Sequence, residues 1–257
     1  MEAVPSTQDT LRVCSDPNNM PYSNRAQEGF ENKIAELIAT GLGLKLEYTW
    51  FPQRMGFIRN TLRFWDEEKE RFRCDLVIGV PEGFDMADTT ASYYRSTYAI
   101  VIKSDGPLRN IHTAEEFLEL PDVQKLKLRI GAFAPSPSID WLIEFGLIEN
   151  TEFYQVMTGD PDYYPGKIIE QELIPGNLDV VLIWGPIAGY FASVNPDASL
   201  RIIPLKSQPG IHFDFAMAMG VRRGEPEWKA RIEKTMTANR EAILSILQHF
   251  QIPLVQD

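Results

Sequence analysis

The chain has 257 residues, of which 44% are hydrophobic, and it carries a formal net charge of −11. This length is sufficient for one large domain or for two smaller lobes with buried cores. The excess of Asp and Glu argues against a nucleic acid or an anionic membrane surface as the partner, because both attract clustered Lys and Arg.

The first third of the chain predicts a parallel α/β unit. Short apolar runs predict strands over 11–15, 44–50 and 75–80. Apolar residues recur at helical spacing from Phe30 to Leu42, and Gly43 is placed to end that helix. The charged stretch 53–72 is interpreted as a second helix. Strands that alternate with helices favour a parallel sheet with right-handed crossovers.

A second α/β set follows the breaker "DGP" at 105–107. One strand is expected before this breaker, over 96–104. After it, strands are expected over 128–133, 153–157, 179–184, 199–205 and 213–221, and helices near 113–120, 138–145 and 166–173, with a last helix that starts at Pro226. We therefore expect two α/β lobes joined by two strands, the first over 8–103 plus 209–257 and the second over 104–208. A ligand or partner is expected in a cleft at the carboxyl ends of the strands.

The stretch "DPNNMPYSN" (16–24) lies between the first strand and the first helix. It is too long and too aromatic for a simple connector, and we interpret it as the lip of the cleft. Asp16, Asn18, Asn19 and Tyr22 also have an ordinary structural explanation, in which Asx turns shape the loop and the aromatic ring packs on its own lobe.

Several segments, in order, resemble the type II periplasmic substrate-binding proteins of the polar amino acid class. They are "VCSDPNNMPYSNRAQEGFENKIAELIA", "DLVIGV", "SYYRSTYAIVI", "IGAFAPSPSIDWL" and "GNLDVVLIWGPIAGYF". The resemblance implies a bilobal type II periplasmic-binding-protein fold. It also implies that the aromatic of the first loop lines the cleft.

More specific motifs resemble the accessory proteins of the MxaJ/XoxJ type, which are encoded with PQQ-dependent methanol dehydrogenases. These motifs are "RVCSDPNNMPYSN", "YTWFPQRMGFIRNTL", "RCDLVIGVPEGFD" and "AILSILQHFQIPLV". The resemblance implies a periplasmic protein of a methylotroph that acts with methanol dehydrogenase and its cytochrome c. Both the calcium-dependent and the lanthanide-dependent dehydrogenase stay open as partners.

The chain departs from amino acid binders at two positions that hold the ligand. Such binders clamp the ligand carboxylate with an Arg shortly after the third strand, but Asp75 to Tyr94 contains no Arg or Lys. They also hold the ammonium group with an acid at the end of the strand after "LD", where this chain has Trp184. A free amino acid is therefore a poor candidate ligand.

The remaining candidates each have a structural alternative. Phe84 could belong to a simple turn, Trp184 could fill the space that the acid vacates, and Arg54 could be an ordinary surface arginine beside aromatics. Tyr93, Tyr94 and Arg95 could form hinge packing, and Ser136 and Ser138 could cap a helix rather than bind an anion. The candidate cleft or partner-binding residues are Asp16, Asn18, Asn19, Tyr22, Arg54, Phe84, Tyr93, Tyr94, Arg95, Ser136, Ser138 and Trp184.

No catalytic motif, metal-ligand spacing or cofactor-binding motif is present, so we expect neither enzyme activity nor a metal or cofactor. We expect a monomeric, non-enzymatic accessory component of methanol oxidation that acts by protein contact or in maturation. The alternatives are a solute-binding protein for a small polar molecule and a hydrolyase of the cyclohexadienyl dehydratase kind. No apolar run is long enough to span a bilayer, and the start "MEAVPSTQDT" lacks the features of a signal peptide.

The two cysteines, Cys14 and Cys74, raise opposite expectations. The periplasmic context implied by the resemblance favours a bridge. The expected register argues against one, because Cys14 lies near the end of one strand and Cys74 at the start of its neighbour. An offset of about four residues at about 3.3 Å each exceeds the reach of a disulfide. We therefore expect two free, buried thiols.

Overall fold

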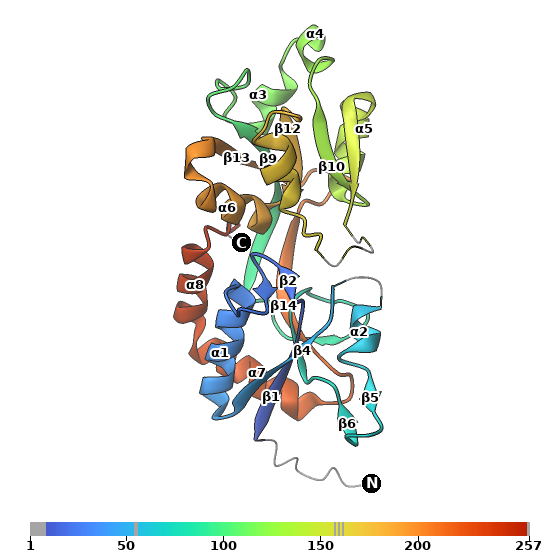
Figure 1. Ribbon diagram of the computed structural model, residues 1–257, viewed down its shortest axis with the longest axis vertical. Helices are drawn as coiled ribbons and strands as arrows, with labels where there is room; N and C mark the ends of the chain where they lie inside the picture. Colours follow the sequence, from blue (N-terminus) through green and yellow to red (C-terminus); the bar gives the residue numbers. More distant parts are fainter. Residues whose placement is uncertain (1–8, 54–55, 157, 159, 161, 256–257) are drawn as a thin grey trace. The chain divides into compact units, whose positions relative to one another are not determined.

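The computed structural model describes residues 9–53, 56–156, 158, 160 and 162–255 (Figure 1). Arg54 lies outside the described residues. The chain forms two compact units. Unit 1 takes the chain up to Tyr93 and again over Ala216–Ile246, and unit 2 takes Tyr94–Phe215 and the chain from Leu247 onward. These bounds differ from the expected lobes because the strand 94–103 pairs with strands of unit 2.

Unit 1 is built on a sheet with the strand order β4-β1-β7-β14. Its strands are β1 (Thr10–Ser15), β4 (Lys45–Trp50), β7 (Leu76–Pro81), β14 (Asp214–Val221) and the short β8 (Asp88–Thr89). The first three strands run parallel, as predicted, and β14 runs antiparallel to β7 and β8. Helix α1 (Phe30–Leu42) packs on this sheet with its apolar face, and Gly43 ends it in the left-handed conformation at φ 69°.

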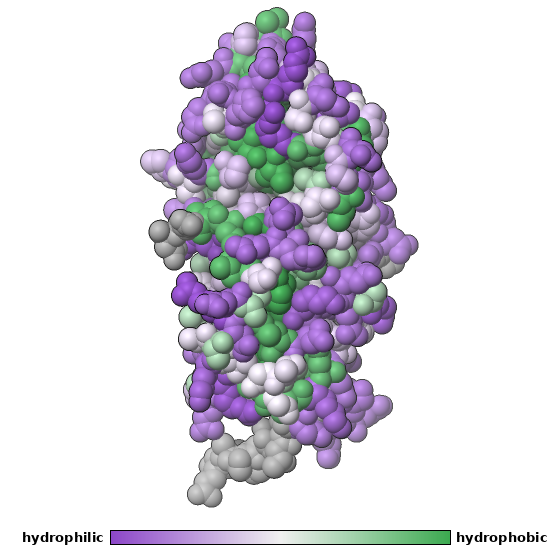
Figure 2. Space-filling view, turned by 90° about the vertical axis from the view of Figure 1, so that its left-hand side faces the viewer, coloured by the Kyte–Doolittle hydropathy of each residue, from purple (hydrophilic) through white to green (hydrophobic). Residues whose placement is uncertain are grey.

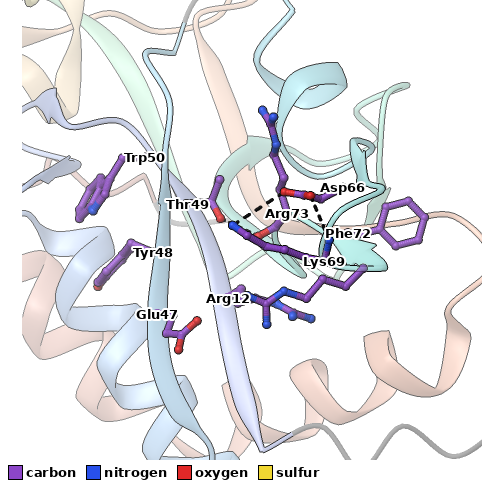
Figure 3. Close-up of a pocket in the computed structure, with 10 residues that line it drawn as sticks. Arg12, Glu47, Tyr48, Thr49, Trp50, Asp66, Lys69, Phe72 and Arg73 are labelled. Atoms are coloured by element: carbon purple, nitrogen blue, oxygen red, sulfur yellow. Dashed lines mark hydrogen bonds and ion pairs between the residues drawn. The ribbon is translucent and has the colours of Figure 1, made fainter.

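The connection between β4 and β7 is not the predicted helix over 53–72. The described part of it contains one short helix, α2 (Phe57–Asn60), and a hairpin of β5 (Trp65–Asp66) and β6 (Arg71–Phe72). Trp65 and Phe72 pair across the hairpin with their ring centroids 5.1 Å apart. Figure 3 shows this hairpin beside β1 and β4, and the Thr49 hydroxyl donates a 2.6 Å hydrogen bond to the Arg73 carbonyl oxygen. The charged residues of 53–72 suggested a solvated helix. The pairing of Trp65 with Phe72 across the turn instead stabilises a hairpin.

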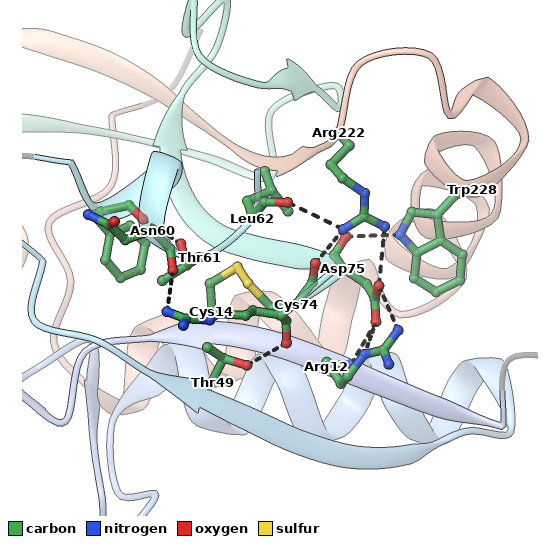
Figure 4. Close-up of a disulfide and its surroundings, with 12 residues drawn as sticks. Arg12, Cys14, Thr49, Asn60, Thr61, Leu62, Cys74, Asp75, Arg222 and Trp228 are labelled. Carbon is green, nitrogen blue, oxygen red and sulfur yellow. Dashed lines mark hydrogen bonds and ion pairs between the residues drawn. A yellow bond between two sulfur atoms is a disulfide. The ribbon is translucent and has the colours of Figure 1, made fainter. Parts of the chain in front are cut away.

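The expectation of two free thiols is wrong, because Cys14 and Cys74 form a disulfide with their Cα atoms 5.5 Å apart (Figure 4). In the sheet, Cys14 lies opposite Val77 and not opposite Cys74. This offset along the strand is the one that argued against a bridge. Cys74, however, is not part of an extended strand, because the chain bends at Arg73 and Asp75 before β7 begins. The bends return Cys74 to the side of Cys14, and both side chains are buried.

A buried ion network holds the end of this connection. The Asp75 carboxylate, 2% exposed, accepts hydrogen bonds from Arg12 Nε at 2.8 Å and from Arg222 Nη2 at 3.2 Å (Figure 4). The Arg222 guanidinium lies over the Phe72 ring at 4.3 Å, and Trp228 Nε1 donates to the Asp75 carbonyl oxygen. The segment that precedes β7 is thereby tied to the segment that follows β14.

Unit 2 is built on a sheet with the strand order β11-β10-β12-β9-β13. Its strands are β9 (Tyr94–Lys103), β10 (Ile130–Ala134), β11 (Thr151–Gln155), β12 (Val180–Trp184) and β13 (Leu200–Pro204). Its helices are α3 (Ala114–Leu118), α4 (Asp122–Lys125), α5 (Pro137–Glu144), α6 (Gly185–Val194), the 3₁₀ turns Ile148–Asn150 and Pro196–Ala198, and a π-helical stretch over Ile168–Leu173. The predicted strands are confirmed, with bounds shifted by one to two residues, since continuous β-branched runs mark buried strands.

The predicted last helix is two helices, α7 (Pro226–Ala238) and α8 (Arg240–His249). Asn239 separates them, and its backbone N–H and side-chain amide both bond to the carbonyl oxygen of Thr235. The boundary between the units falls within α8. The chain therefore passes between the units three times, at 93/94, 215/216 and 246/247. The sequence predicted two connections, each of them a strand.

Apolar side chains reach the surface at scattered positions, and on the face drawn in Figure 2 hydrophobic residues are interspersed with hydrophilic ones. Among the described residues, no helix is both long and apolar enough to cross a bilayer.

Candidate functional site

The candidate residues of unit 1 lie at the carboxyl ends of its parallel strands. Asp16 follows β1 directly, and Phe84 follows β7. Because β1, β4 and β7 run parallel, the loops after them share one edge of the sheet. Asp16 and Phe84 therefore lie at the same edge of the sheet, although they are 68 positions apart in the chain.

The first loop is fixed by its own hydrogen bonds. Asp16 Oδ1 accepts from the Asn18 backbone N–H at 2.8 Å, and its other carboxylate oxygen accepts from the Gln53 backbone N–H. Ser23 Oγ donates to the Asp16 carbonyl oxygen at 2.8 Å. Asn19 Nδ2 donates to the Gln53 side chain at 3.0 Å, and Asn19 Oδ1 is buried without a partner among the described residues. Asp16 thus shapes the loop, and Asn19 has an unused acceptor.

Tyr22 packs on its own unit. Its ring centroid lies 5.3 Å from that of Phe30, and its carbonyl oxygen accepts from the Glu31 backbone N–H at 2.9 Å. Gly29 permits this contact, since a Cβ there would lie 2.1 Å from the Tyr22 carbonyl oxygen. The loop therefore satisfies the first amides of α1, and Tyr22 stays half-buried with part of its surface exposed.

Phe84 is half-buried and packs against the apolar cluster that contains the disulfide. Its backbone N–H donates to the Pro81 carbonyl oxygen at 3.1 Å, which closes the turn after β7. The ring therefore supports the base of this loop.

Glu31 is a residue of interest that the sequence pattern did not single out. The residue is 9% exposed, and its carboxyl lies so close to Gly79 of β7 that a Cβ on that glycine would be 2.0 Å from Glu31 Oε1. Burial, with a smaller contribution from the negative charge of Asp16, raises the pKa of Glu31 well above its ordinary range. A signal was available, because Glu31 is an acid on the same helical face as the apolar residues Ile34 and Ile38.

The residues at the passage between the units are engaged within the fold. Tyr93 donates its backbone N–H to the Met217 carbonyl oxygen at 2.8 Å, and the Tyr94 side chain is buried. Arg95 forms an ion pair with Asp214 at 2.7 Å. The hydrogen bond from Ser207 and then the Arg95 charge lower the pKa of Asp214. The guanidinium is therefore held by a carboxylate of its own unit.

In unit 2, Ser136 and Ser138 lie after β10 at the start of α5. Ser136 does not cap the helix, since its side chain makes no hydrogen bond to the first turn. Both hydroxyl oxygens are buried without a partner among the described residues, and Ser138 is 0% exposed. Buried hydroxyls without partners are unusual in folded proteins.

Trp184 ends β12 and belongs to an aromatic cluster of unit 2. Its ring centroid lies 5.2 Å from that of Tyr98 and 5.9 Å from that of Phe215, with edge-to-face geometry in both pairs. Burial raises the pKa of Tyr98 to about 12, so the phenol is neutral at physiological pH. The end of β12, where the sequence resemblance implied a ligand-binding acid in amino acid binders, therefore carries an uncharged aromatic cluster.

At the carboxyl ends of the strands, unit 1 therefore carries a polar loop, and unit 2 carries buried hydroxyls and an aromatic cluster. The structure brings Asp16, Asn18, Asn19 and Tyr22 together in one loop and brings Ser136 and Trp184 to the same edge of the second sheet. Among the described residues, no group of three or more His, Cys, Asp or Glu side chains could hold a metal ion.

Comparison with known proteins identifies relatives over nearly the whole chain. The crystal structure of the periplasmic binding protein XoxJ from Methylobacterium extorquens AM1 is 31% identical, with a TM-score of 0.75, and the match covers 96% of this chain and all of that one. MxaJ from Methlophaga aminisulfidivorans MPT is 25% identical with a TM-score of 0.75, over 95% of this chain and all of that one. Protein MoxJ of Paracoccus denitrificans is 26% identical over 98% of this chain and 92% of its own length. No family model matches the chain.

Proposed function

We propose a function from the premise that this chain belongs to the MxaJ/XoxJ type of type II periplasmic binding proteins. The chain acts in the periplasm as a non-enzymatic accessory component of a PQQ-dependent methanol dehydrogenase system, and it does so by protein contact or in maturation. The loops at the carboxyl ends of the strands in each unit form its contact surface.

The aromatic cluster at the end of β12 is the observation that carries this proposal. A binder of amino acids needs a charged group for each end of its ligand, but Trp184, Tyr98 and Phe215 offer an uncharged surface. The segment between Asp75 and Tyr94 supplies no Arg or Lys either. Aromatic side chains dominate the energetics of protein contacts, since each buries a large area with few rotatable bonds.

The internal bonding of the first loop supports the same function. Asp16 and Ser23 hold the loop in one conformation, so little conformational entropy is lost when a partner binds to it. Asn18, Asn19 and Tyr22 keep part of their surface accessible. A loop held in this way presents polar and aromatic groups at fixed positions.

The test measures binding of purified PQQ-dependent methanol dehydrogenase, and separately of its cytochrome c, to the immobilised chain. We expect wild type to bind one of them and Trp184→Ala to weaken that binding on the order of thirtyfold, which is the typical loss for an aromatic anchor. Trp184→Phe keeps an aromatic ring and is expected to retain most of the affinity. Val194→Ala, a truncation at an apolar position that is 48% exposed in the same unit, is the matched control.

A second candidate function is the binding of a small polar solute, and the buried hydroxyls of Ser136 and Ser138 favour it. A ligand that accepts or donates two hydrogen bonds would satisfy both groups. If wild type binds neither the dehydrogenase nor the cytochrome at low salt, the first proposal is refuted and this one replaces it.

A further inference from the structure

Unit 1 contains a basic pocket in an otherwise acidic protein. The pocket has a volume of about 430 Å³ and lies where β1 and β4 face the β5–β6 hairpin (Figure 3). Six of its ten lining residues are charged, and four of these are cations, although the chain as a whole has a net charge of −11. The charged lining residues are Arg12, Glu47, Asp66, Lys69, Arg71 and Arg73. We call this feature the hairpin pocket.

The cations of the hairpin pocket differ in how far they are neutralised. Arg12 is paired with Asp75 at 2.8 Å, and Arg73 donates to the Asn60 carbonyl oxygen and stacks on a phenylalanine ring. Within the described part of the chain, Lys69 has only a loose pair, with its Nζ 3.8 Å from Asp66. Arg71 is exposed and makes no ion pair with the described residues. Lys69 and Arg71 therefore carry the charge that is available to a partner.

The hairpin that carries these two cations is held firmly against the unit. The Thr49 hydroxyl bonds to the Arg73 backbone, the Arg222 guanidinium covers the Phe72 ring, and the disulfide fixes Cys74 two residues further on. A surface held by three independent contacts loses little entropy when it binds. The hairpin is therefore rigid enough to present Lys69 and Arg71 at fixed positions.

Beside the pocket, Trp65 is 46% exposed, and its ring contacts the pocket-lining Phe72 edge-to-face at 5.1 Å. Exposed Trp and Arg side chains are the residues most enriched among interface anchors. A small ligand within the pocket would leave Trp65 uncovered, and small-molecule sites are mainly apolar. An extended chain could occupy the pocket and also cover Trp65.

We infer that the hairpin pocket and Trp65 form a docking site for an acidic segment of a partner protein. Carboxylates of the segment face Lys69 and Arg71, and a neighbouring apolar side chain packs on Trp65. The site lies beyond the first loop and the Trp184 cluster of the proposed function, although Trp50 at the end of β4 also lines it. It can be tested without methanol dehydrogenase, so its failure and that of the proposed function are distinguishable.

The test uses fluorescence anisotropy of a short labelled peptide that is rich in Glu and contains a central Leu, with the full-length protein. We expect Lys69→Glu, Arg71→Glu and Trp65→Ala each to weaken binding about tenfold. Glu47→Gln removes an opposing charge and is expected to tighten binding about threefold. Lys234→Glu reverses an exposed charge elsewhere in unit 1 and is the matched control, with no expected effect.

Two results would overturn the inference. The first is equal or tighter binding of a peptide in which every Glu is replaced by Lys, or no binding of the acidic peptide at all. The second is displacement of the peptide by inorganic phosphate or citrate together with full affinity in Trp65→Ala, which would identify a small-anion site. Melting temperatures of all variants establish that each one is folded.

Discussion

The carboxyl group of Glu31 lies directly against the backbone of Gly79, so closely that a Cβ on the glycine would be 2.0 Å from Glu31 Oε1. The two residues come from α1 and β7, and their contact places an ionisable group in the interior of unit 1. Gly79 has φ 74°, a conformation that favours glycine independently of the contact.

Glu31 is expected to make the stability of the protein depend on pH. Its pKa is raised in the folded state, so the folded chain binds this proton more tightly than the unfolded chain. The contribution of this proton to stability is therefore complete below a pH of about 4.5, and it is lost as pH rises through the folded-state pKa. Glu31→Gln should remove this dependence and be more stable than wild type at pH 8, as measured by urea unfolding at pH 5 and pH 8.

The control for this experiment is Glu36→Gln, an exposed acid on the same helix, which should behave like wild type at both pH values. A Glu31→Gln variant that loses stability equally at pH 5 and pH 8 would contradict a raised pKa of Glu31 in the folded state.

Gly79→Ala is expected to destabilise the protein by on the order of 2 to 3 kcal/mol. The methyl group meets the Glu31 carboxyl, and the left-handed conformation adds a cost of about 1 kcal/mol. Combining it with Glu31→Ala should recover the steric part of the loss, so the two substitutions are not additive. Denaturant unfolding of both single variants and the double variant measures this coupling, and strict additivity would show that the two residues do not touch.

Removal of the disulfide is expected to cost about 4 kcal/mol, because Cys14 and Cys74 are 60 positions apart and the bridge restricts the unfolded chain. A Cys14→Ser/Cys74→Ser variant and the reduced wild type should therefore unfold at similar, lower denaturant concentrations. Mass spectrometry of the unreduced, alkylated protein should show two hydrogens fewer than the dithiol form. Alkylation of both cysteines in the unreduced, denatured protein would be incompatible with the bridge.

Standard amino acids are expected not to raise the melting temperature. A ligand that binds only the folded state stabilises it by mass action, but the aromatic cluster of Trp184, Tyr98 and Phe215 supplies no carboxylate to pair with an ammonium group. A thermal-shift screen of each amino acid at millimolar concentration tests this. A concentration-dependent rise that persists in Trp184→Phe would favour the solute-binding function instead.

The parallel core strands and α1 could be predicted because their patterns are local. The run from Phe30 to Leu42 keeps helical spacing, and the apolar runs of β7 and β12 are of the kind found in buried strands. The positions of these strands in the chain were enough to place Asp16, Phe84 and Trp184 at strand ends. The expectation that the charged clamp of amino acid binders is missing rests on the family resemblance together with the residues at those positions.

The segment 53–72 could not be predicted in this way, because its structure depends on contacts with distant parts of the chain. Phe72 is covered by Arg222, and Arg73 is held by Thr49, so the hairpin is stabilised by residues that are remote in sequence. The disulfide was missed for the same reason, since bends at Arg73 and Asp75 return Cys74 to Cys14.

The sequence by itself determined the α/β class, the family resemblance and the residues at the strand ends, because periodicity and motifs are properties of neighbouring residues. The tertiary structure alone decided that Glu31 is buried against Gly79, that Cys14 and Cys74 are joined, and that four cations line one pocket. Each of these depends on which residues packing brings together, and burial and charge clustering exist only after the chain has folded.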